Sequence, residues 1–198
     1  MERFFRVFLF FLSVLFCLGC ESPKNAPPNY PSLEFNVDPT LLEPKTQDMK
    51  LRMNFSPPIG WKPVSSTLFV NETHKTYQEL EMLISEPKLF FQHKPSNSLC
   101  IVSKFLTSPF GTTQDFVSTV TGSLRKQFPE ASIQQTTFFK DSLLVNQIRI
   151  LTSEHVVFKL VLLPSDLDPF EVLYILPKNI YMTQSRPIES SIGSIQVF

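Results

Sequence analysis

The sequence predicts an α+β fold with a single, largely antiparallel sheet covered by helices. About 150 residues follow position 48, which is enough chain for one sizeable core. Four segments after residue 132 are rich in branched and aromatic residues and are separated by mostly short polar breaks. Short breaks favour antiparallel neighbours, because a parallel connection needs a dozen residues or more. An amphipathic segment before these strands and a helix-compatible segment after them supply the helices.

The first elements are short. Residues 49–55 alternate apolar and polar side chains, which predicts a half-buried strand ended by Pro57 and Pro58. Residues 66–70 are a candidate second strand, and residues 77–85 fit helical and strand spacing equally.

A hairpin and a helix are predicted next. Residues 88–92 and 98–106 have strand composition on either side of a turn that contains Pro95 and Asn97. Residues 112–128 are predicted to form a helix that Pro129 ends, because apolar side chains recur every four residues at Phe116, Val120, Leu124 and Phe128.

The strands after this helix should form an antiparallel meander. The segment 155–163 is apolar on both faces, so we predict that it is a central strand covered on both sides. The tail has helical spacing at Ile188 and Ile192 after Pro187, which we interpret as a first-turn proline, and then a short strand at 195–197. The predicted strands of the meander are 133–140, 143–151, 155–163 and 170–176.

The N-terminus has the pattern of a secretory signal. Arg3 and Arg6 precede the uncharged apolar run Val7–Leu18. Twelve residues at about 1.5 Å each are too short to cross a hydrocarbon core of about 30 Å. We therefore expect export rather than a membrane-spanning helix.

The residues that follow, Cys17-Leu18-Gly19-Cys20, resemble a bacterial lipobox, with Cys17 where that family usually has an aliphatic residue. The resemblance implies cleavage between Gly19 and Cys20, and an S-diacylglyceryl and N-acyl group on Cys20. Two or more acyl chains anchor a protein stably to a bilayer. The expected location is the cell membrane or the outer membrane, with the domain outside the cytoplasm.

Residues 21–48 are rich in proline and show no helix or strand period, which predicts a semi-rigid spacer. The expected organisation is a signal peptide (1–19), a lipidated N-terminus with a proline-rich tether (20–48) and a globular domain (49–198). An alternative stays open, in which apolar residues of the tether dock along the domain surface. The residues that favour docking are Tyr30, Leu33, Phe35, Val37, Leu41 and Leu42.

Two short motifs in the domain resemble the PsbP/Mog1-like group. These are Phe55-Ser-Pro-Pro-Ile-Gly-Trp61 after the first strand and the Ile188–Ile195 segment near the end. The resemblance covers residues 49–198 and implies an α/β/α sandwich. It supplies no catalytic residues.

The composition excludes some functions. With 18 basic and 18 acidic residues, the chain lacks the positive charge that nucleic-acid binding needs. His74, His93 and His155 are scattered, and no metal, phosphate-loop or dinucleotide motif is present, so we expect no metal and no cofactor. Cys100 should be a buried thiol, because it lies in an apolar strand pattern.

We therefore expect a non-catalytic envelope lipoprotein whose domain binds an envelope protein or a small ligand. The alternative is a lipid-tethered enzyme whose site is assembled from distant residues, with Cys100, His93 or the pair Asp166 and Asp168 as its members. The adjacent pairs Phe90-Phe91 and Phe138-Phe139 place one ring on each face of a strand. They suggest a second covered face or a partner surface.

Overall fold

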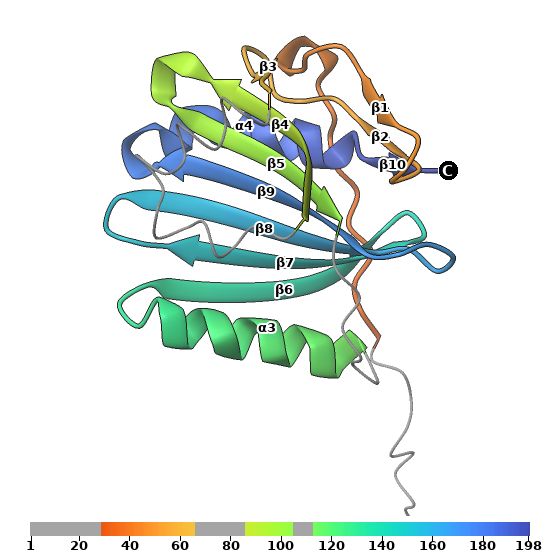
Figure 1. The fold of residues 1–198 in the computed structure, drawn as a ribbon, viewed down its shortest axis with the longest axis vertical. Helices are drawn as coiled ribbons and strands as arrows, with labels where there is room; N and C mark the ends of the chain where they lie inside the picture. Colours follow the sequence, from red (N-terminus) through yellow and green to blue (C-terminus); the bar gives the residue numbers. More distant parts are fainter. Residues whose placement is uncertain (1–28, 66–85, 105–112) are drawn as a thin grey trace, which may run out of the picture.

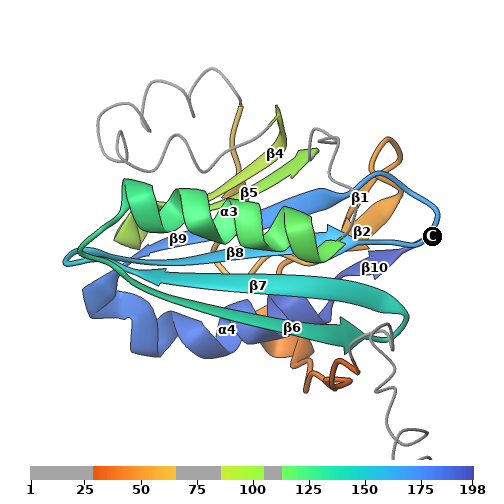
Figure 2. The same cartoon turned by 90° about the horizontal axis from the view of Figure 1, so that it is seen from below.

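The computed structural model describes residues 29–65, 86–104 and 113–198. An antiparallel seven-stranded sheet forms its centre, with α3 (Thr113–Gln127) on one face and α4 (Tyr181–Gly193) on the other (Figures 1 and 2). The predicted α+β class, with a sheet between helices, is confirmed. In spatial order the strands are β3 (Lys62–Pro63), β4 (Glu86–His93), β5 (Ser98–Lys104), β9 (Phe170–Pro177), β8 (His155–Leu163), β7 (Leu143–Leu151) and β6 (Ser132–Lys140).

The meander matches its prediction closely. β7 and β8 have the predicted bounds, β6 and β9 differ from theirs by one residue at one end, and α3 differs by one residue at each end. β8 lies between β7 and β9, with Val156 packed on the α4 side and Val157 on the α3 side. The central, doubly covered strand is therefore confirmed. The candidate elements 66–70 and 77–85 lie outside the described residues.

A second, smaller sheet corrects the expectation of a single one. It consists of β1 (Thr46–Asp48), β2 (Met53–Phe55) and β10 (Gln196–Val197). The predicted strand 49–55 is wrong in its first half, because the Asp48 carboxylate accepts hydrogen bonds of 2.8 Å from the backbone N–H groups of Lys50 and Leu51. The turn closes with Arg52 at a positive φ of 49°.

Pro187 is inside α4, not in its first turn. The helix begins at Tyr181, after the 3₁₀ turn η4 (Lys178–Ile180). Pro187 has no N–H to donate to the helix, which is ordinarily destabilising. Its ring is buried, as are Ile188 and Ile192 of the same helix, and this apolar burial against the sheet offsets the lost hydrogen bond.

Both faces of the large sheet carry an apolar core. Phe91 packs on the α4 side and Phe90 on the α3 side, as the alternation of strand side chains requires. The largest fully buried side chains include Trp61, Tyr174, Phe55, Phe138 and Phe170. No helix among the described residues is both long and apolar enough to span a bilayer.

Residues 31–48, the N-terminal strap, lie against the domain. The strap enters at the edge of the large sheet, where Leu33 N–H donates to the carbonyl of Phe139 and Phe139 N–H donates to that of Pro31, both at 2.8 Å. Pro31 itself has no N–H with which to continue the pairing along β6. The Tyr30 and Phe139 rings then meet edge to face.

The strap next crosses α4 and reaches β2. The Phe35 ring packs 5.9 Å from that of Phe138, and Asp38 N–H donates to Ser190 Oγ at 3.2 Å. Beyond the 3₁₀ turn η1 (Pro39–Leu41), the Glu43 carboxylate accepts from Gly60 N–H at 2.7 Å and from the Lys62 ammonium at 2.8 Å. These two donors hold the pKa of Glu43 below its usual value.

The expectation of a spacer is therefore wrong for residues 31–48, and the docking alternative describes them instead. The local rule failed because prolines prevent a regular strand or helix but do not prevent an extended chain from packing on a surface. The domain thus begins near Tyr30. A spacer remains a prediction only for residues 21–28, which lie outside the described residues.

Gly193→Ala should loosen the strap. A Cβ atom there would lie 2.6 Å from Phe35 Cβ and 2.7 Å from Val37 Cγ2, so the strap must shift. We expect a loss of about 1–3 kcal/mol in the free energy of unfolding. Urea denaturation followed by the fluorescence of Trp61, the single tryptophan, measures it.

The matched control is Gly122→Ala in α3, where an added Cβ would meet nothing within 4 Å. Alanine should stabilise that helix by up to about 1 kcal/mol. Equal effects of the two substitutions would contradict the docked strap.

Candidate functional site

A groove of about 720 Å³ opens at the end of the large sheet where α3 ends. This volume is within the range of small-molecule sites, about 300–1,000 Å³. Three separate parts of the chain form it: the α3–β6 connection, the β7–β8 turn and the start of η4. The lining residues are Gln127, Phe128, Pro129, Glu130, Ala131, Ser132, Leu151, Thr152, Ser153 and Lys178.

The α3–β6 wall follows from the way the helix ends. Phe128 N–H still bonds to the carbonyl of Leu124 at 2.9 Å, but Pro129 cannot extend the helical ladder. Ala131 N–H instead closes a short turn on the carbonyl of Phe128 at 3.1 Å. This turn leaves the Phe128 ring half-buried at the groove.

The opposite wall is held by a hydroxyl. Thr152 Oγ1 accepts hydrogen bonds from the N–H groups of Glu154 at 3.3 Å and His155 at 2.9 Å, which fixes the β7–β8 turn. Lys178 N–H donates to the carbonyl of Glu154 at 2.7 Å and so ties the start of η4 to the same turn. Both walls are therefore preformed.

The chemistry of the groove suits binding. Phe128, Ala131 and Leu151 give it apolar walls, and Glu130 and Lys178 add an exposed anion and an exposed cation. Gln127 Nε2 is buried and has no hydrogen-bond acceptor in the described part of the chain. The lining includes Ser132 and Ser153 but no His, the usual general base that activates a serine nucleophile.

Cys100 lies in β5 and is fully buried. Burial raises the pKa of its thiol well above the usual value. Its neighbour Tyr174 shares a 2.9 Å hydrogen bond with Ser191 Oγ, and Ser191 in turn donates to the carbonyl of Ser56 at 2.7 Å. These contacts join the sheet, α4 and the segment after β2, so the surroundings of Cys100 stabilise the fold.

His93 has partners that the sequence analysis did not select. Its Nδ1 lies 2.6 Å from Ser96 Oγ, and Ser96 Oγ lies 2.8 Å from Ser98 Oγ. The imidazole stacks on Trp61 and packs against Gly60, where an added Cβ would lie 3.0 Å from the ring. The H-x-x-S-x-S spacing around the turn is the sequence signal for this cluster, which closes the β4–β5 turn.

The carboxylate pair is elsewhere. Asp166 and Asp168 are exposed in the loop between β8 and β9, and Asp168 forms an ion pair of 2.8 Å with Lys104. Asp168 thus lies at the Lys104 end of β5, whereas His93 pairs with Ser98 at the other end of that strand. The described residues contain no cluster of three or more His, Cys, Asp or Glu side chains that would hold a metal.

The predicted lipidation and cleavage residues, Gly19 and Cys20, are outside the described part of the chain. His74, one of the scattered histidines, is outside it as well. The lipidation site therefore stays a prediction from sequence.

Comparison with known proteins gives a likeness of fold. No protein-family model and no curated protein matches the chain. Among solved structures, the chain is similar to the solution structure of a cyanobacterial PsbP (CyanoP) from Synechocystis sp. PCC 6803, at 14% identity and a TM-score of 0.48. The alignment covers 92% of this chain and 99% of that one. At this identity the likeness concerns the fold alone.

The two motifs behind the predicted resemblance lie in the core. Trp61 is fully buried, packs edge to face on Tyr174 and donates from Nε1 to Gln184 Oε1 at 3.2 Å. Ile188 and Ile195 belong to the same α4-side core. The residues of these motifs therefore contribute to core packing and do not form a functional site.

Cys100 should be inert in the native state. In a chain carrying Cys17→Ser and Cys20→Ala it is the sole thiol, and we expect no reaction with a disulfide reagent up to about pH 9, because burial disfavours the thiolate. Full reaction is expected in denaturant. Rapid native-state labelling would contradict its structural assignment and return Cys100 to the list of candidate nucleophiles.

The groove should bind an amphiphilic probe. Anilinonaphthalene sulfonate combines an apolar body with an anion, which suits the apolar walls and Lys178. Ala131→Phe should fill the groove and weaken binding by about tenfold, a loss of about 1.4 kcal/mol. Fluorescence titration measures it.

Ser123→Phe is the matched control, since Ser123 is exposed on α3 and does not line the groove. Equal affinity of the Ala131→Phe and Ser123→Phe chains would show that the probe binds elsewhere.

Proposed function

We propose that this chain is a membrane-anchored lipoprotein of the bacterial cell envelope whose domain binds a protein or a small ligand without catalysing a reaction. The observation that carries the anchor is the Gly19-Cys20 pair at the end of a basic and then apolar N-terminal run. The anchor attaches the protein to the cell membrane or the outer membrane, with the domain outside the cytoplasm.

The docked strap supports a domain held close to the bilayer. Eleven residue steps separate Cys20 from Pro31, the first residue with a backbone contact to β6. A fully extended chain of that length spans at most about 40 Å. The anchor therefore limits both the distance of the domain from the lipid and its orientation.

The groove supports the binding role. Ser132 lines the groove at the start of β6, and Phe139 receives the strap near the end of the same strand. Seven residues of strand separate the two by about 23 Å. A ligand or a partner segment can thus reach the groove without displacing the strap.

The choice between binding and catalysis follows from the site residues. The candidates for the tethered enzyme are Cys100, which is buried, His93, which closes a turn, and the exposed loop pair Asp166 and Asp168. The preformed groove, by contrast, offers apolar surface with few polar groups, which is the usual composition of a binding pocket.

Metabolic labelling with an alkyne-tagged fatty acid tests the anchor. We expect labelling of the native chain and its complete loss in Cys20→Ala, because the acyl chains attach through Cys20. Cys17→Leu, which places the usual aliphatic residue at that lipobox position, and Cys100→Ser are matched controls that remove the other two cysteines and should label normally. Persistent labelling of Cys20→Ala would overturn the proposal.

A further inference from the structure

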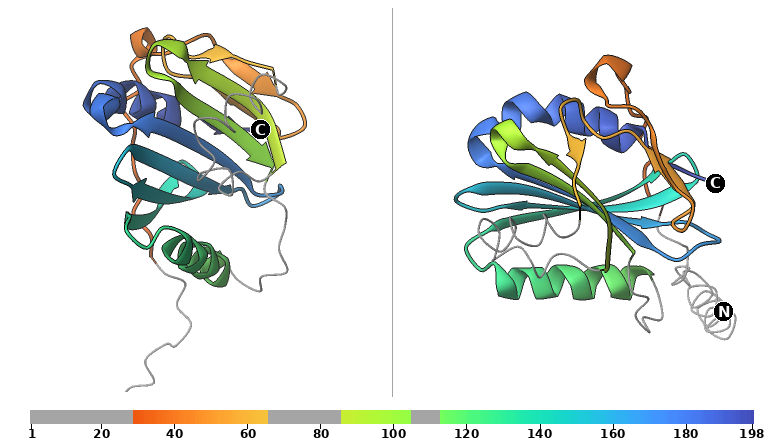
Figure 3. Two further views of the ribbon diagram at one scale, coloured as in Figure 1. Left: turned by 60° about the vertical axis from the view of Figure 1, so that its left-hand side comes forward. Right: turned by 45° about the horizontal axis from the view of Figure 1, so that its top comes forward.

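The strap enters the domain at the end that also carries the β1–β2 turn, the β6–β7 turn, the β8–β9 loop and Phe198. We name this end the anchor end. Phe198 N–H donates to the carbonyl of Arg52 at 3.0 Å, which places the chain after β10 beside the β1–β2 turn. The β6–β7 turn and the β8–β9 loop meet them around a small hollow of about 190 Å³. In Figures 1 and 3 these loops point away from the domain on one side, where the strap also enters.

Large apolar side chains are exposed at this end. Met49, in the β1–β2 turn, is 70% exposed, and Phe198 is 42% exposed. Leu33, which pairs with Phe139 where the strap enters, is 40% exposed. Exposed apolar residues at neighbouring loop tips favour a surface that is covered in the working protein.

Cations flank the same apolar tips. Lys50 and Arg52 are exposed in the turn that carries Met49, while Asp166 and Asp168 lie in the neighbouring loop. The two signs are therefore mixed, so attraction to an oppositely charged partner is not the main term. Apolar side chains with adjacent Lys or Arg are the combination that enters the interfacial layer of a lipid bilayer.

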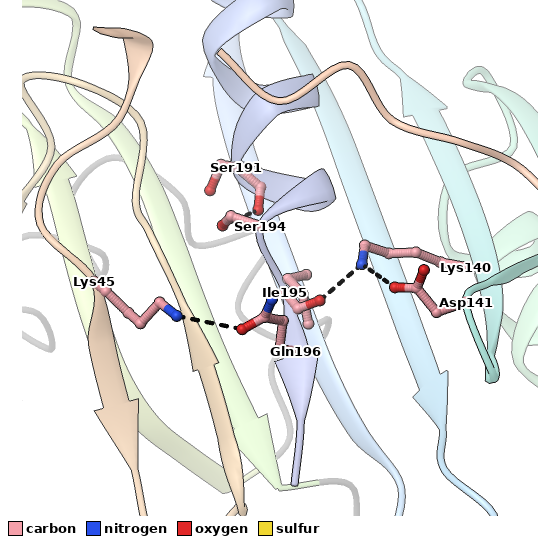
Figure 4. A network of polar contacts seen from close by, with 7 residues as sticks. All are labelled: Lys45, Lys140, Asp141, Ser191, Ser194, Ile195 and Gln196. Carbon is pink, nitrogen blue, oxygen red and sulfur yellow. Dashed lines mark hydrogen bonds and ion pairs between the residues drawn. The ribbon is translucent and has the colours of Figure 1, made fainter. Parts of the chain in front are cut away.

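Hydrogen bonds fix this end of the domain. The Lys140 ammonium, which is largely buried, donates to the carbonyl of Ile195 at 2.9 Å and pairs with Asp141 at 2.9 Å (Figure 4). On the other side of the C-terminal strand, Lys45 donates to Gln196 Oε1 at 3.3 Å. The segment that leads to Phe198 is therefore tied to both β6 and the strap.

We propose that the anchor end rests on the lipid bilayer, with the side chains of Met49 and Phe198 in its interfacial layer and the groove facing away from it. This inference rests on the proposed lipid anchor at Cys20, whose tether reaches the domain at this end. The loop contacts alone are too small for stable binding. The anchor makes them effective, because it converts a weak second contact into an intramolecular one.

Depth-dependent quenching tests the orientation. The full lipidated chain is placed in phosphatidylcholine vesicles that contain brominated lipid, with an environment-sensitive fluorophore on Met49→Cys or, as the control at the groove, Ser153→Cys. Side chains in the interfacial layer are buried only about 5–10 Å into the bilayer, so the brominated lipid should quench a fluorophore at position 49 but reach one at the groove less. We expect quenching to be about twofold stronger at position 49. The unsubstituted chain should take up no label at the buried Cys100.

Phe198→Cys is the second variant if Met49→Cys does not fold, and it should give the same result as position 49. Raising the salt concentration should leave the quenching unchanged, because the contact is mainly apolar. Equal quenching at the two ends, in a chain that floats with the vesicles, would overturn this inference and leave the proposed anchor intact. A chain that does not float with the vesicles would overturn both.

Discussion

The large sheet is apolar on both faces, and the rest of the structure follows from the need to cover each of them. β9 shows the constraint most clearly, since every residue from Phe170 to Leu176 is buried. Antiparallel sheets often leave one face to water, but this one does not. α3 packs on one face. On the other face, α4 packs together with residues of the strap and of the small sheet, which extend the cover beyond the helix.

This constraint explains why the strap belongs to the domain. Phe35 packs on Phe138 of β6 and fits against Gly193, the last residue of α4. Without the strap, Phe138 would lose one side of its cover at the edge of the sheet. The segment that leads to the proposed anchor is thus part of the core packing, and the tether is coupled directly to β6.

Local sequence patterns predict the elements that depend on neighbouring residues alone. β7 and β8 were predicted to the residue because branched and aromatic side chains run between short polar breaks. The strap was mispredicted because its contacts are remote: Asp38 bonds to Ser190, which is 152 positions away. The Asp48 turn was missed because one capping carboxylate outweighs an alternating apolar pattern.

The candidate site was the least predictable part for the same reason. Pro129 correctly marked the end of α3, but a helix end alone does not indicate a groove. Lys178 and Leu151 reach the α3–β6 connection only through the order of strands in the sheet. Reactive side chains have recognisable spacing in a sequence, whereas a shaped apolar surface such as the groove exists only in the folded chain.

Buried polar groups are paired in most of the described core, whereas one that lines the groove is not. Burying a charge or a hydroxyl is costly unless it is paired. Lys159 pairs with Glu171 on the neighbouring strand of the same sheet, and Tyr174 pairs with Ser191 of α4, so these groups already have partners within the core. The buried polar atoms without a partner, within the described residues, are Asn54 Oδ1, Ser103 Oγ, Gln127 Nε2 and Asn146 Oδ1.

Gln127 differs from the other three residues in that list because it lines the groove. An unpaired buried donor costs free energy that a ligand acceptor would recover on binding. The same donor lies among apolar walls, where a hydrogen bond is stronger than in water. The groove thus combines a preformed apolar surface with one unmet polar requirement, and the proposed ligand would satisfy both by binding alone.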